Sequence, residues 1–357
     1  MNAAWLSFLQ DQGAIIREDR VAEYGDASAE GAAAGSNAVV LADLSHHGLI
    51  RFAGDDAKSF LQGQVSCDID AIQPSAGHAR ALHGGYCTPK GRMLASFLAW
   101  HDGSGYLMQL PSALVAAMLG RLSRYVMRAR VGLTDHSDAC VRIGVAGASA
   151  ADLLQQALGG IPESPMEVIH VSGGSILRLA QQRFEAVLAG DRAPAAWERL
   201  AGLGGRPVGA ACWDWLEIRA GIPVIVPATQ EQFVPQMVNL DAIGGISFRK
   251  GCYPGQEIVA RTHYLGRVKR RMALAHIDVP PGAVVAAADT LFSADTGSQP
   301  GGMIVNAAPA PGGGFDALGV VQTTSLESGT VRWGAPDGPP LEFIPLPYPV
   351  SSPADGS

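Results

Sequence analysis

The chain has 357 residues, of which 47% are hydrophobic, and a mildly acidic formal net charge of −7. This length predicts two or three domains. There is no apolar run of about 18 residues that would span a bilayer, and the start lacks the basic residues and continuous apolar segment of a signal peptide. Five scattered cysteines without a C-x-x-C pair argue against a disulfide framework. We therefore expect a cytoplasmic protein that does not enter a membrane.

The first half of the chain predicts a short N-terminal segment followed by an α+β unit. Residues 25–37 are small and polar without periodicity, so we expect residues 1–36 to be an N-terminal segment ending in a linker. Strand, turn and helix patterns then alternate. The expected elements are a strand at 39–41 and 48–52, a helix at 56–64 capped by Asp55, antiparallel strands within 80–110, a helix at 112–125 and a strand at 128–133.

A second unit repeats this order, and the C-terminal part differs in character. After residue 267, short apolar runs alternate with Pro/Gly turns, which is typical of a small β-barrel or sandwich. The fold class is therefore α+β, with two subdomains, each a sheet backed by helices, and a C-terminal β-barrel. The predicted divisions are 37–137 plus 205–260, 138–204, a barrel at 261–349 and a disordered tail at 350–357. The second unit is expected to contain strands at 141–145, 168–171, 175–180 and 184–190, and helices after Ser149 and at 195–203.

One stretch, Lys250-Gly251-Cys252-Tyr253-Pro254-Gly255-Gln256-Glu257, combines features of a reactive thiol site. If 250–252 is extended, the ammonium of Lys250 and the sulfur of Cys252 project to the same side. A nearby cation favours the reactive thiolate form of a cysteine. Pro254 and Gly255 suit the two central positions of a type II turn. A buried structural cysteine beside a turn is the alternative, which local chemistry leaves open.

The same region is strongly cationic in an otherwise acidic chain. Residues 249–271 contain seven Lys/Arg and one acid, Glu257, so the remaining chain holds 19 basic and 32 acidic residues. A local cationic stripe of this kind indicates an anionic ligand. A solvated pair of strands rich in Lys/Arg is the alternative.

Other residue patterns indicate a functional site less strongly. Trp213 and Trp215 would share one face of a strand, where a flat heterocycle can stack, although core packing is the alternative. His46 and His47 would face opposite ways on a strand and make poor co-ligands. No dinucleotide, phosphate-loop or complete metal-site pattern is present. Cys252 with His263 lacks a third group to orient the base, so we expect no hydrolytic pair.

The stretch 250–257 resembles the K-G-C-[FY]-T-G-Q-E signature of the YgfZ family of folate-binding, iron–sulfur-maturation proteins. Further blocks resemble the family in the same order along the chain. They lie at residues 60–68, 88–93, 220–223, 233–236, 239–248, 259–262 and 345–348.

The resemblance implies a relative of the glycine cleavage system aminomethyltransferase, with three domains around a central folate pocket. It implies support for assembly or repair of iron–sulfur clusters in client enzymes, including radical enzymes that thiomethylate tRNA. By position, Trp213 and His47 would stack on the pterin, and cations of the stripe, Arg261 among them, would attract the glutamate tail of tetrahydrofolate. The remaining motif residues, Gly251, Tyr253, Gly255, Gln256 and Glu257, would shape the loop around Cys252 and Lys250.

Three departures from the family pattern narrow the expected function. Pro254 replaces a threonine, and His47 replaces a tryptophan. The position of the transferases' catalytic carboxylate falls at Ala95, which has no acid–base group. We therefore expect no ordinary aminomethyl transfer.

The leading hypothesis is a folate-binding accessory protein of iron–sulfur cluster biogenesis with Cys252 as its reactive thiol. A single thiolate cannot hold a cluster that normally needs four ligands, so the expected partners are iron–sulfur assembly proteins or client enzymes. The alternatives are a folate-dependent one-carbon transferase with another base and a non-catalytic interaction module with a structural thiol. Nothing resembles an RNA-binding module, so direct nucleic-acid binding is not expected.

Overall fold

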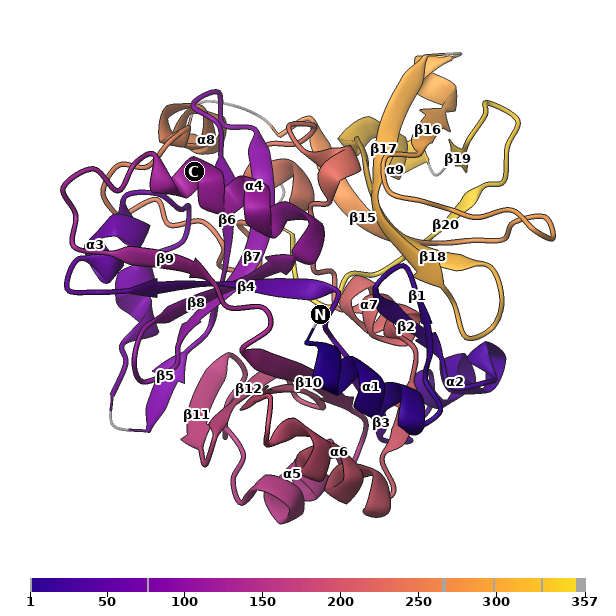
Figure 1. Ribbon diagram of the computed structural model, residues 1–357. Coiled ribbons are helices and arrows are strands. Elements are labelled where there is room, and N and C mark those ends of the chain that lie inside the picture. The colour runs from indigo at the N-terminus through magenta and orange to yellow at the C-terminus, as the bar shows by residue number, and fades with distance from the viewer. Residues whose placement is uncertain (1, 76, 265–267, 298, 329, 351–357) are drawn as a thin grey trace. The chain divides into compact units, whose positions relative to one another are not determined.

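The computed structural model describes residues 2–75, 77–264, 268–297, 299–328 and 330–350 and is drawn in Figure 1. The chain forms two compact units, each assembled from separate segments. Unit 1 comprises Met1–Leu61, Ile69–Leu82 and Leu98–Trp213, and unit 2 comprises Gln62–Asp68, His83–Phe97 and Asp214–Ser357. Within the described residues, no helix has the length and apolar content needed to cross a membrane.

Unit 1 is built on a seven-stranded sheet with one apolar face and one polar face. Its order is β14-β3-β10-β13-β12-β11-β5, antiparallel except where β14 meets β3. Because side chains alternate along a strand, Ile143 and Phe184 enter the apolar core under α1, α5 and α6, whereas Arg142 and Glu185 lie on the other face. The elements are β3 Val40–Asp43, β5 His78–Arg80, β10 Cys140–Ala146, β11 Glu167–Val171, β12 Gly174–Ala180, β13 Arg183–Ala189, β14 Arg206–Val208, α1 Ala3–Asp11, α5 Ala150–Leu158 and α6 Ala193–Gly202.

Most other elements of the first half of the chain follow the sequence prediction, but the strand predicted at 128–133 begins only at Gly132. Strand β4 pairs with β8 and β9, and β8 pairs with the last four residues of β7. The predicted helix at 112–125 is confirmed as α4, and the antiparallel strands predicted within 80–110 are present. The bounds are β4 His47–Ala53, α3 Ala57–Gln62, η1 Ile69–Ile72, β7 Met93–His101, β8 Tyr106–Pro111, α4 Ser112–Ser123 and β9 Gly132–Asp135. Strand β6 (Leu82–Cys87) from His83 on, and β7 up to Phe97, belong to unit 2.

The linker predicted at residues 25–37 is wrong, because this stretch contains helix α2 (Ala27–Ala34) after the hairpin of β1 (Ile15–Arg17) and β2 (Arg20–Glu23). Five of its eight residues are alanine, the best helix former. The side chain of Asp26 caps the helix by accepting from the amide of Ala29. Glu30 is buried and accepts from the amides of Tyr24 and Gly209, which holds the helix in unit 1. The small side chains of this stretch therefore belong to a packed helix and not to a linker.

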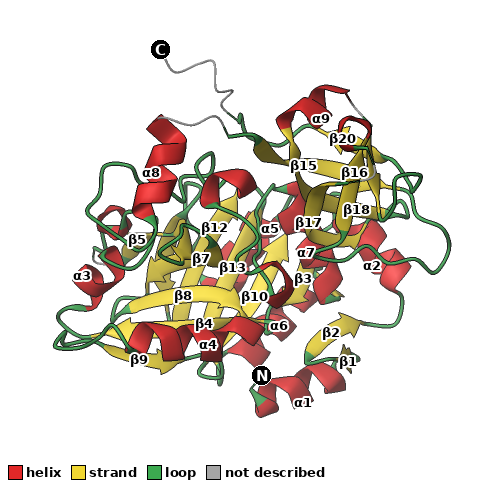
Figure 2. Cartoon of the chain, turned by 90° about the horizontal axis from the view of Figure 1, so that it is seen from above, coloured by secondary structure: helices red, strands yellow, loops and turns green. Residues whose placement is uncertain are grey.

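Unit 2 ends in the β-rich region that the sequence predicted. Its six strands have the order β19-β16-β17-β18-β15-β20, and Figure 2 shows β15, β16, β17, β18 and β20 gathered with α9 beside them. The sheet curls, since an isolated bridge between Arg332 and Pro340 brings the ends of its two edge strands together. The bounds are β15 Arg270–Ile277, β16 Thr290–Ser293, η4 Ala294–Thr296, β17 Pro300–Pro309, β18 Phe315–Gln322, α9 Thr323–Ser328, β19 Val331–Trp333 and β20 Leu341–Ile344.

Both faces of this curled sheet are buried. On β15, Ala275 and Ile277 enter the core inside the curl, whereas Met272 and Leu274 pack on the other side with Met93 and further residues of unit 2. The core that contains Met272 and Leu274 also includes residues of α7 Ala210–Arg219 (from Asp214 on), η3 Pro235–Val238 and α8 Gln256–Tyr264. The remaining element of unit 2 is η2 Pro227–Thr229. Arg267 of the cationic stripe and residues 351–357 of the predicted tail lie outside the described residues.

Candidate functional site

The motif at 250–257 forms an anchored loop in unit 2. The Nζ of Lys250 donates hydrogen bonds to the carbonyl oxygens of Val65, at 2.7 Å, and Cys67, at 2.8 Å. The same ammonium lies 5.4 Å from the ring centroid of Tyr253, which is buried. Cys252, between these two anchors, is exposed. The loop is therefore fixed on both sides of a thiol that reaches solvent.

The turn after the thiol has the predicted type II form. Gly255 has φ of +83°, and the amide of Gln256 donates to the carbonyl of Tyr253 at 3.1 Å. A Cβ at Gly255 would lie 2.5 Å from the carbonyl oxygen of Thr88, so the turn docks closely on the 88–91 turn. Helix α8 begins directly after it, with Glu257 exposed in the first turn, where a negative charge suits the helix dipole.

Two other thiols of unit 2 lie behind this loop in a different environment. Cys67 and Cys87 are buried, and burial raises the pKa of each thiol to about 12, although the charge of Lys250 acts in the opposite direction on Cys67. Burial also raises the pKa of Tyr253, and the neighbouring Cys87 and Cys67 add to the effect. Cys252 is thus the exposed thiol of this unit.

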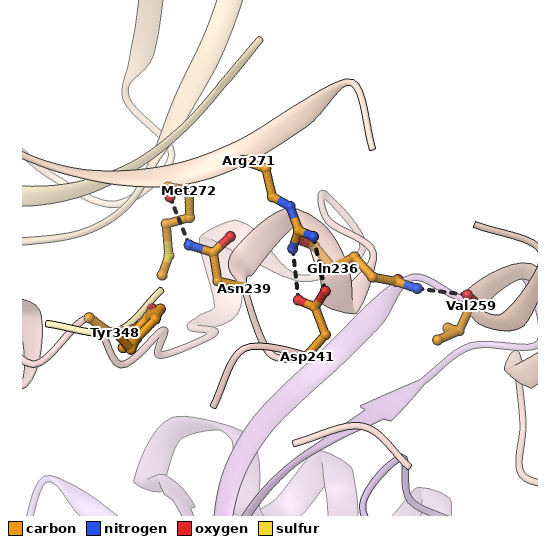
Figure 3. Close-up of polar contacts among 8 residues, drawn as sticks. Gln236, Asn239, Asp241, Val259, Arg271, Met272 and Tyr348 are labelled. Carbon is orange, nitrogen blue, oxygen red and sulfur yellow. Dashed lines mark hydrogen bonds and ion pairs between the residues drawn. The ribbon is translucent and has the colours of Figure 1, made fainter. Parts of the chain in front are cut away.

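A polar network ties several family-like blocks together in unit 2, as Figure 3 shows. Arg271 forms a two-pronged ion pair with Asp241, at 2.7 and 3.0 Å, and donates to the carbonyl of Gln236 at 2.7 Å. The side chain of Asn239 donates to the carbonyl of Met272 at 2.8 Å. Blocks that are separate in the sequence thus meet at the start of the C-terminal sheet.

The same network reaches α8 and the end of the described chain. The amide of Gln236 donates to the carbonyl of Val259 at 2.6 Å, which anchors the buried side of α8 (Figure 3). The hydroxyl of Tyr348 donates to the carbonyl of Gly221 at 2.7 Å, and burial raises the pKa of Tyr348 to about 12. Most family-like blocks therefore build the scaffold that positions the loop and helix.

The position expected for a catalytic carboxylate holds an alanine, whose side chain is apolar. Ala95 lies on β7 and is buried. The two neighbouring residues form structural hydrogen bonds. The carbonyl oxygen of Leu94 accepts from the side-chain amide of Gln230, and the hydroxyl of Ser96 accepts from the backbone amide of Ile225. Nothing at this position can exchange a proton with a substrate.

Trp213 is buried in unit 1, with 1% of its surface exposed. Its indole lies against Gly144 of β10, where a Cβ would approach within 2.5 Å of the ring. The guanidinium of Arg183 lies 5.7 Å from the ring centroid. A ligand that stacks on this indole must therefore displace a neighbouring group.

His47 reaches the same polar face of the sheet. Its Nδ1 lies 3.3 Å from the Nε2 of Gln109, which also donates to the carboxylate of Glu185 at 3.1 Å. All three side chains are buried. Glu185 is the register partner of Gly144, on which Trp213 packs, so the fold brings the predicted pair Trp213 and His47 to one buried polar cluster.

Two local predictions about these residues are wrong. Trp213 and Trp215 lie on helix α7, where a 100° step per residue sends them to different faces; Trp215 instead donates to Asp316 at 2.8 Å. His46 precedes β4 in a turn, and its ring lies 4.4 Å from that of His47, so the two do not face opposite ways. Both predictions assumed a strand, whereas Trp213 and Trp215 lie on a helix and His46 lies in a turn.

The sequence did not indicate Gln109, Arg183 and Glu185 as site residues. On β13, charged residues alternate with Phe184 and Ala186, a pattern that normally indicates a face in solvent. The fold buries that face instead. Within this cluster, the Nε1 of Trp213 and the Oε1 of Gln109 are buried with no hydrogen-bond partner among the described residues. The carboxylate of Glu185 thus lies in a buried cluster with one donor and one acceptor that lack partners among the described residues.

The remaining predicted residues lie in unit 2 with Cys252. Gly251 is exposed, Gln256 is the first residue of α8, and Arg261 is exposed on the same helix. Among the described residues, no three His, Cys, Asp or Glu side chains are grouped to hold a metal ion. No disulfide joins any of the five cysteines, all of which the structure describes.

Comparison with known proteins identifies the family. Residues 8–246 match the GCVT N-terminal domain. The tRNA-modifying protein YgfZ of Colwellia psychrerythraea is 35% identical over 235 residues, which cover 65% of this chain and 70% of the relative. The chain belongs to the YgfZ family. The YgfZ protein of Pectobacterium atrosepticum is similarly close, at 34% identity over 240 residues, covering 66% of this chain and 69% of its own.

A solved structure supports the fold of this YgfZ-family chain. The glycine cleavage system aminomethyltransferase T of Bartonella henselae matches with a TM-score of 0.73, 16% identity and 96% of each chain covered. At that identity the likeness concerns the fold alone. The predicted fold class, α+β and aminomethyltransferase-like with a C-terminal barrel, is thereby confirmed, with the barrel present as a curled half-barrel.

Proposed function

We propose that this chain is a folate-binding accessory protein that supports assembly or repair of iron–sulfur clusters in client enzymes, among them enzymes that modify tRNA. The observation that carries the proposal is the exposed thiol of Cys252 in a loop fixed by Lys250 and the docked Gly255 turn. Membership of a family whose relatives are named tRNA-modifying proteins supports the connection to tRNA. A cytoplasmic location, where thiols stay reduced, belongs to the same proposal.

In this proposal the buried polar cluster of unit 1 holds tetrahydrofolate. The carboxylate of Glu185 and the amide of Gln109 would pair with the pterin, and Trp213 and His47 would pack against it. Bound folate would supply a one-carbon carrier to the site. Ala95 occupies the position of the transferases' catalytic carboxylate and has no acid–base group, so aminomethyl transfer is not proposed. The attraction of the glutamate tail by Arg261 stays a prediction.

The experiment compares Cys252→Ala with Cys140→Ala in cells that lack the native gene. Iron–sulfur enzyme activities and thiomethylated tRNA are measured under oxidative stress. We expect Cys252→Ala to fail to restore both, while Cys140→Ala, a half-buried thiol of unit 1, restores them. Because Cys252 is exposed, its truncation removes no packing, and equal thermal stability of the two variants controls for folding. Full restoration by Cys252→Ala would refute the proposed role of the thiol.

The folate part is tested separately by titration calorimetry with tetrahydrofolate. Glu185→Gln keeps the shape of the side chain and its contact with Gln109 but removes the charge, so binding should weaken by at least tenfold. Unchanged binding would place folate elsewhere. Conversion of tetrahydrofolate to a methylene adduct by the native chain would instead support the transferase alternative.

A further inference from the structure

We infer that a surface on helix α8 binds single-stranded RNA directly. Its rings are Phe248, His263 and Tyr264, and its cations are Arg249, next to Phe248 in the chain, and Arg261, one helical turn before Tyr264, all in unit 2. The inference goes beyond the proposed function, which needs no contact between this chain and RNA. It rests on the arrangement of rings and cations described next, and it does not use the thiol of Cys252.

Three rings meet on this surface. Phe248 and His263 stack with centroids 3.8 Å apart and planes inclined by 14°. The ring of Tyr264 stands edge-on to both, with centroids 6.2 Å from Phe248 and 4.8 Å from His263. His263 is exposed, and Tyr264 exposes 67% of its surface. The last turn of α8 thus presents the rings of His263 and Tyr264 to solvent.

Two exposed arginines adjoin these rings in the sequence without being neutralised by an ion pair among the described residues. Arg249 follows Phe248 in the chain, Arg261 lies on α8, and both are exposed. Neither forms a side-chain ion pair or hydrogen bond with any residue that the structure describes, and the same is true of Lys269 and Arg270. The adjoining Arg271, in contrast, is paired with Asp241. The only acid on α8 is Glu257.

This combination favours nucleic acid over a protein partner. Exposed rings stack on bases, and arginines bind the phosphates between them. The centres of protein interfaces are depleted in charged residues and rich in apolar area. Within 248–264, Tyr264 is the one large apolar side chain found exposed, which is too little for such a centre. Rings need unstacked bases, so a single strand or a loop fits better than a duplex.

The sequence did not predict this surface because it contains no recognised RNA-binding module. The stacked pair joins a loop residue to a helix residue fifteen positions later, and only the fold of 248–264 brings them together. A surface of rings and cations requires no module of its own.

The test measures fluorescence anisotropy of a labelled twelve-nucleotide single-stranded RNA and of a tRNA transcript with the full chain. Affinity should fall as salt rises, with a log–log slope of about −1.4 if two phosphates are neutralised. A duplex of the same sequence should bind at least tenfold more weakly. Tyr264→Ala should weaken binding of the single strand about tenfold, and Tyr264→Phe, which keeps the ring, should bind like the native chain. Arg261→Gln should reduce the salt slope by about 0.7.

The matched controls are Tyr125→Ala and Arg124→Gln, an exposed tyrosine and arginine of unit 1 that should leave binding unchanged. Several results would overturn the inference: no binding at low salt, equal binding of duplex and single strand, or equal effects of the α8 and control variants. The inference would also be overturned if polyglutamate competed as strongly as unlabelled RNA, because the cations would then bind any acidic chain. Cys252→Ala should bind RNA normally, so this inference and the proposed thiol can fail independently.

Discussion

At the scale of single residues, Lys250 shows how a motif residue can serve structure more than chemistry. Its spacing from Cys252 suggested a cation beside a thiol. In the fold its ammonium binds two backbone carbonyls of the 65–67 segment and lies near the ring of Tyr253. Its charge also acts on the buried Cys67. Lys250 therefore holds the loop and its supporting segment together, and this is the basis on which Cys252 is presented.

Replacing Lys250 by methionine keeps the length of the side chain but removes its donors. The carbonyls of Val65 and Cys67 would lose their bonds to a charged group, and we expect the free energy of unfolding to fall by roughly 1.5–3 kcal/mol in urea denaturation. Loosening of this segment should also speed labelling of the buried Cys67. Lys90→Met, which changes an exposed lysine of a turn, is the control. Equal stability of both variants would mean that the two bonds contribute nothing.

At the scale of elements, a polar cluster ties strands β15 and β18 to helix α7. The carboxylate of Asp316 is buried and accepts from Trp215, at 2.8 Å, and from Arg219, at 3.5 Å. Its other oxygen lies 2.8 Å from the Nδ1 of His276. The Nε2 of His276 lies 3.4 Å from Asp278. One imidazole thus sits between two carboxylates beside an arginine.

This cluster predicts a pH dependence of stability. Burial alone would lower the pKa of His276, but hydrogen bonds and charges from Asp316 and Asp278 raise it above its usual 6.5. The other charged groups around His276 are Arg219, which contacts Asp316, and Glu342, the register partner of His276 on β20. A raised pKa in the folded state stabilises the fold fully below about pH 6.5, and that contribution is lost as pH rises through the folded pKa.

The measurement is urea denaturation of the native chain and of His276→Gln at pH 5.5 and 8.5. The native chain should lose more stability over this interval than the variant, because glutamine does not titrate. His78→Gln, which removes a more exposed histidine of unit 1, should behave like the native chain. An identical pH dependence for native chain and His276→Gln would contradict the assignment.

At the scale of the whole molecule, each unit is assembled from segments that are far apart in the chain. The chain passes from one unit to the other at five points, so neither unit is one continuous stretch. The core of unit 2 contains Cys87 and Met93 beside residues beyond 214. Cutting the chain at the last of these points, after Trp213, therefore removes part of that core.

We expect neither the fragment 1–213 nor the fragment 214–357 to fold as it does in the full chain. The second fragment lacks the 62–68 and 83–97 segments, including the carbonyls that bind Lys250, and the first retains them without their partners. Near-ultraviolet circular dichroism and urea titration of each fragment, with the full chain as reference, measure this. A cooperative transition in the fragment 214–357 at the urea midpoint of the full chain would disprove it.

The sequence by itself determined the features that depend on near neighbours. Alternation and glycine–proline punctuation located most strands and turns, and Pro254-Gly255 specified a type II turn because its chemistry is local. The long motif also identified the family. Alanine-rich α2 and the helix that carries Trp213 were missed, since short stretches without a clear period do not distinguish coil or strand from helix.

Only the tertiary structure decided which groups those elements bring together. Lys250 binds a carbonyl 185 positions away, Gln109 reaches Glu185 across 76 positions, and Phe248 stacks on a residue of α8. The burial of Glu185 and Trp213 depends equally on what covers the polar face of the sheet. Periodicity reports a residue's own element, whereas burial and partners depend on segments that arrive from elsewhere in the chain, and these contacts set the chemistry of the site.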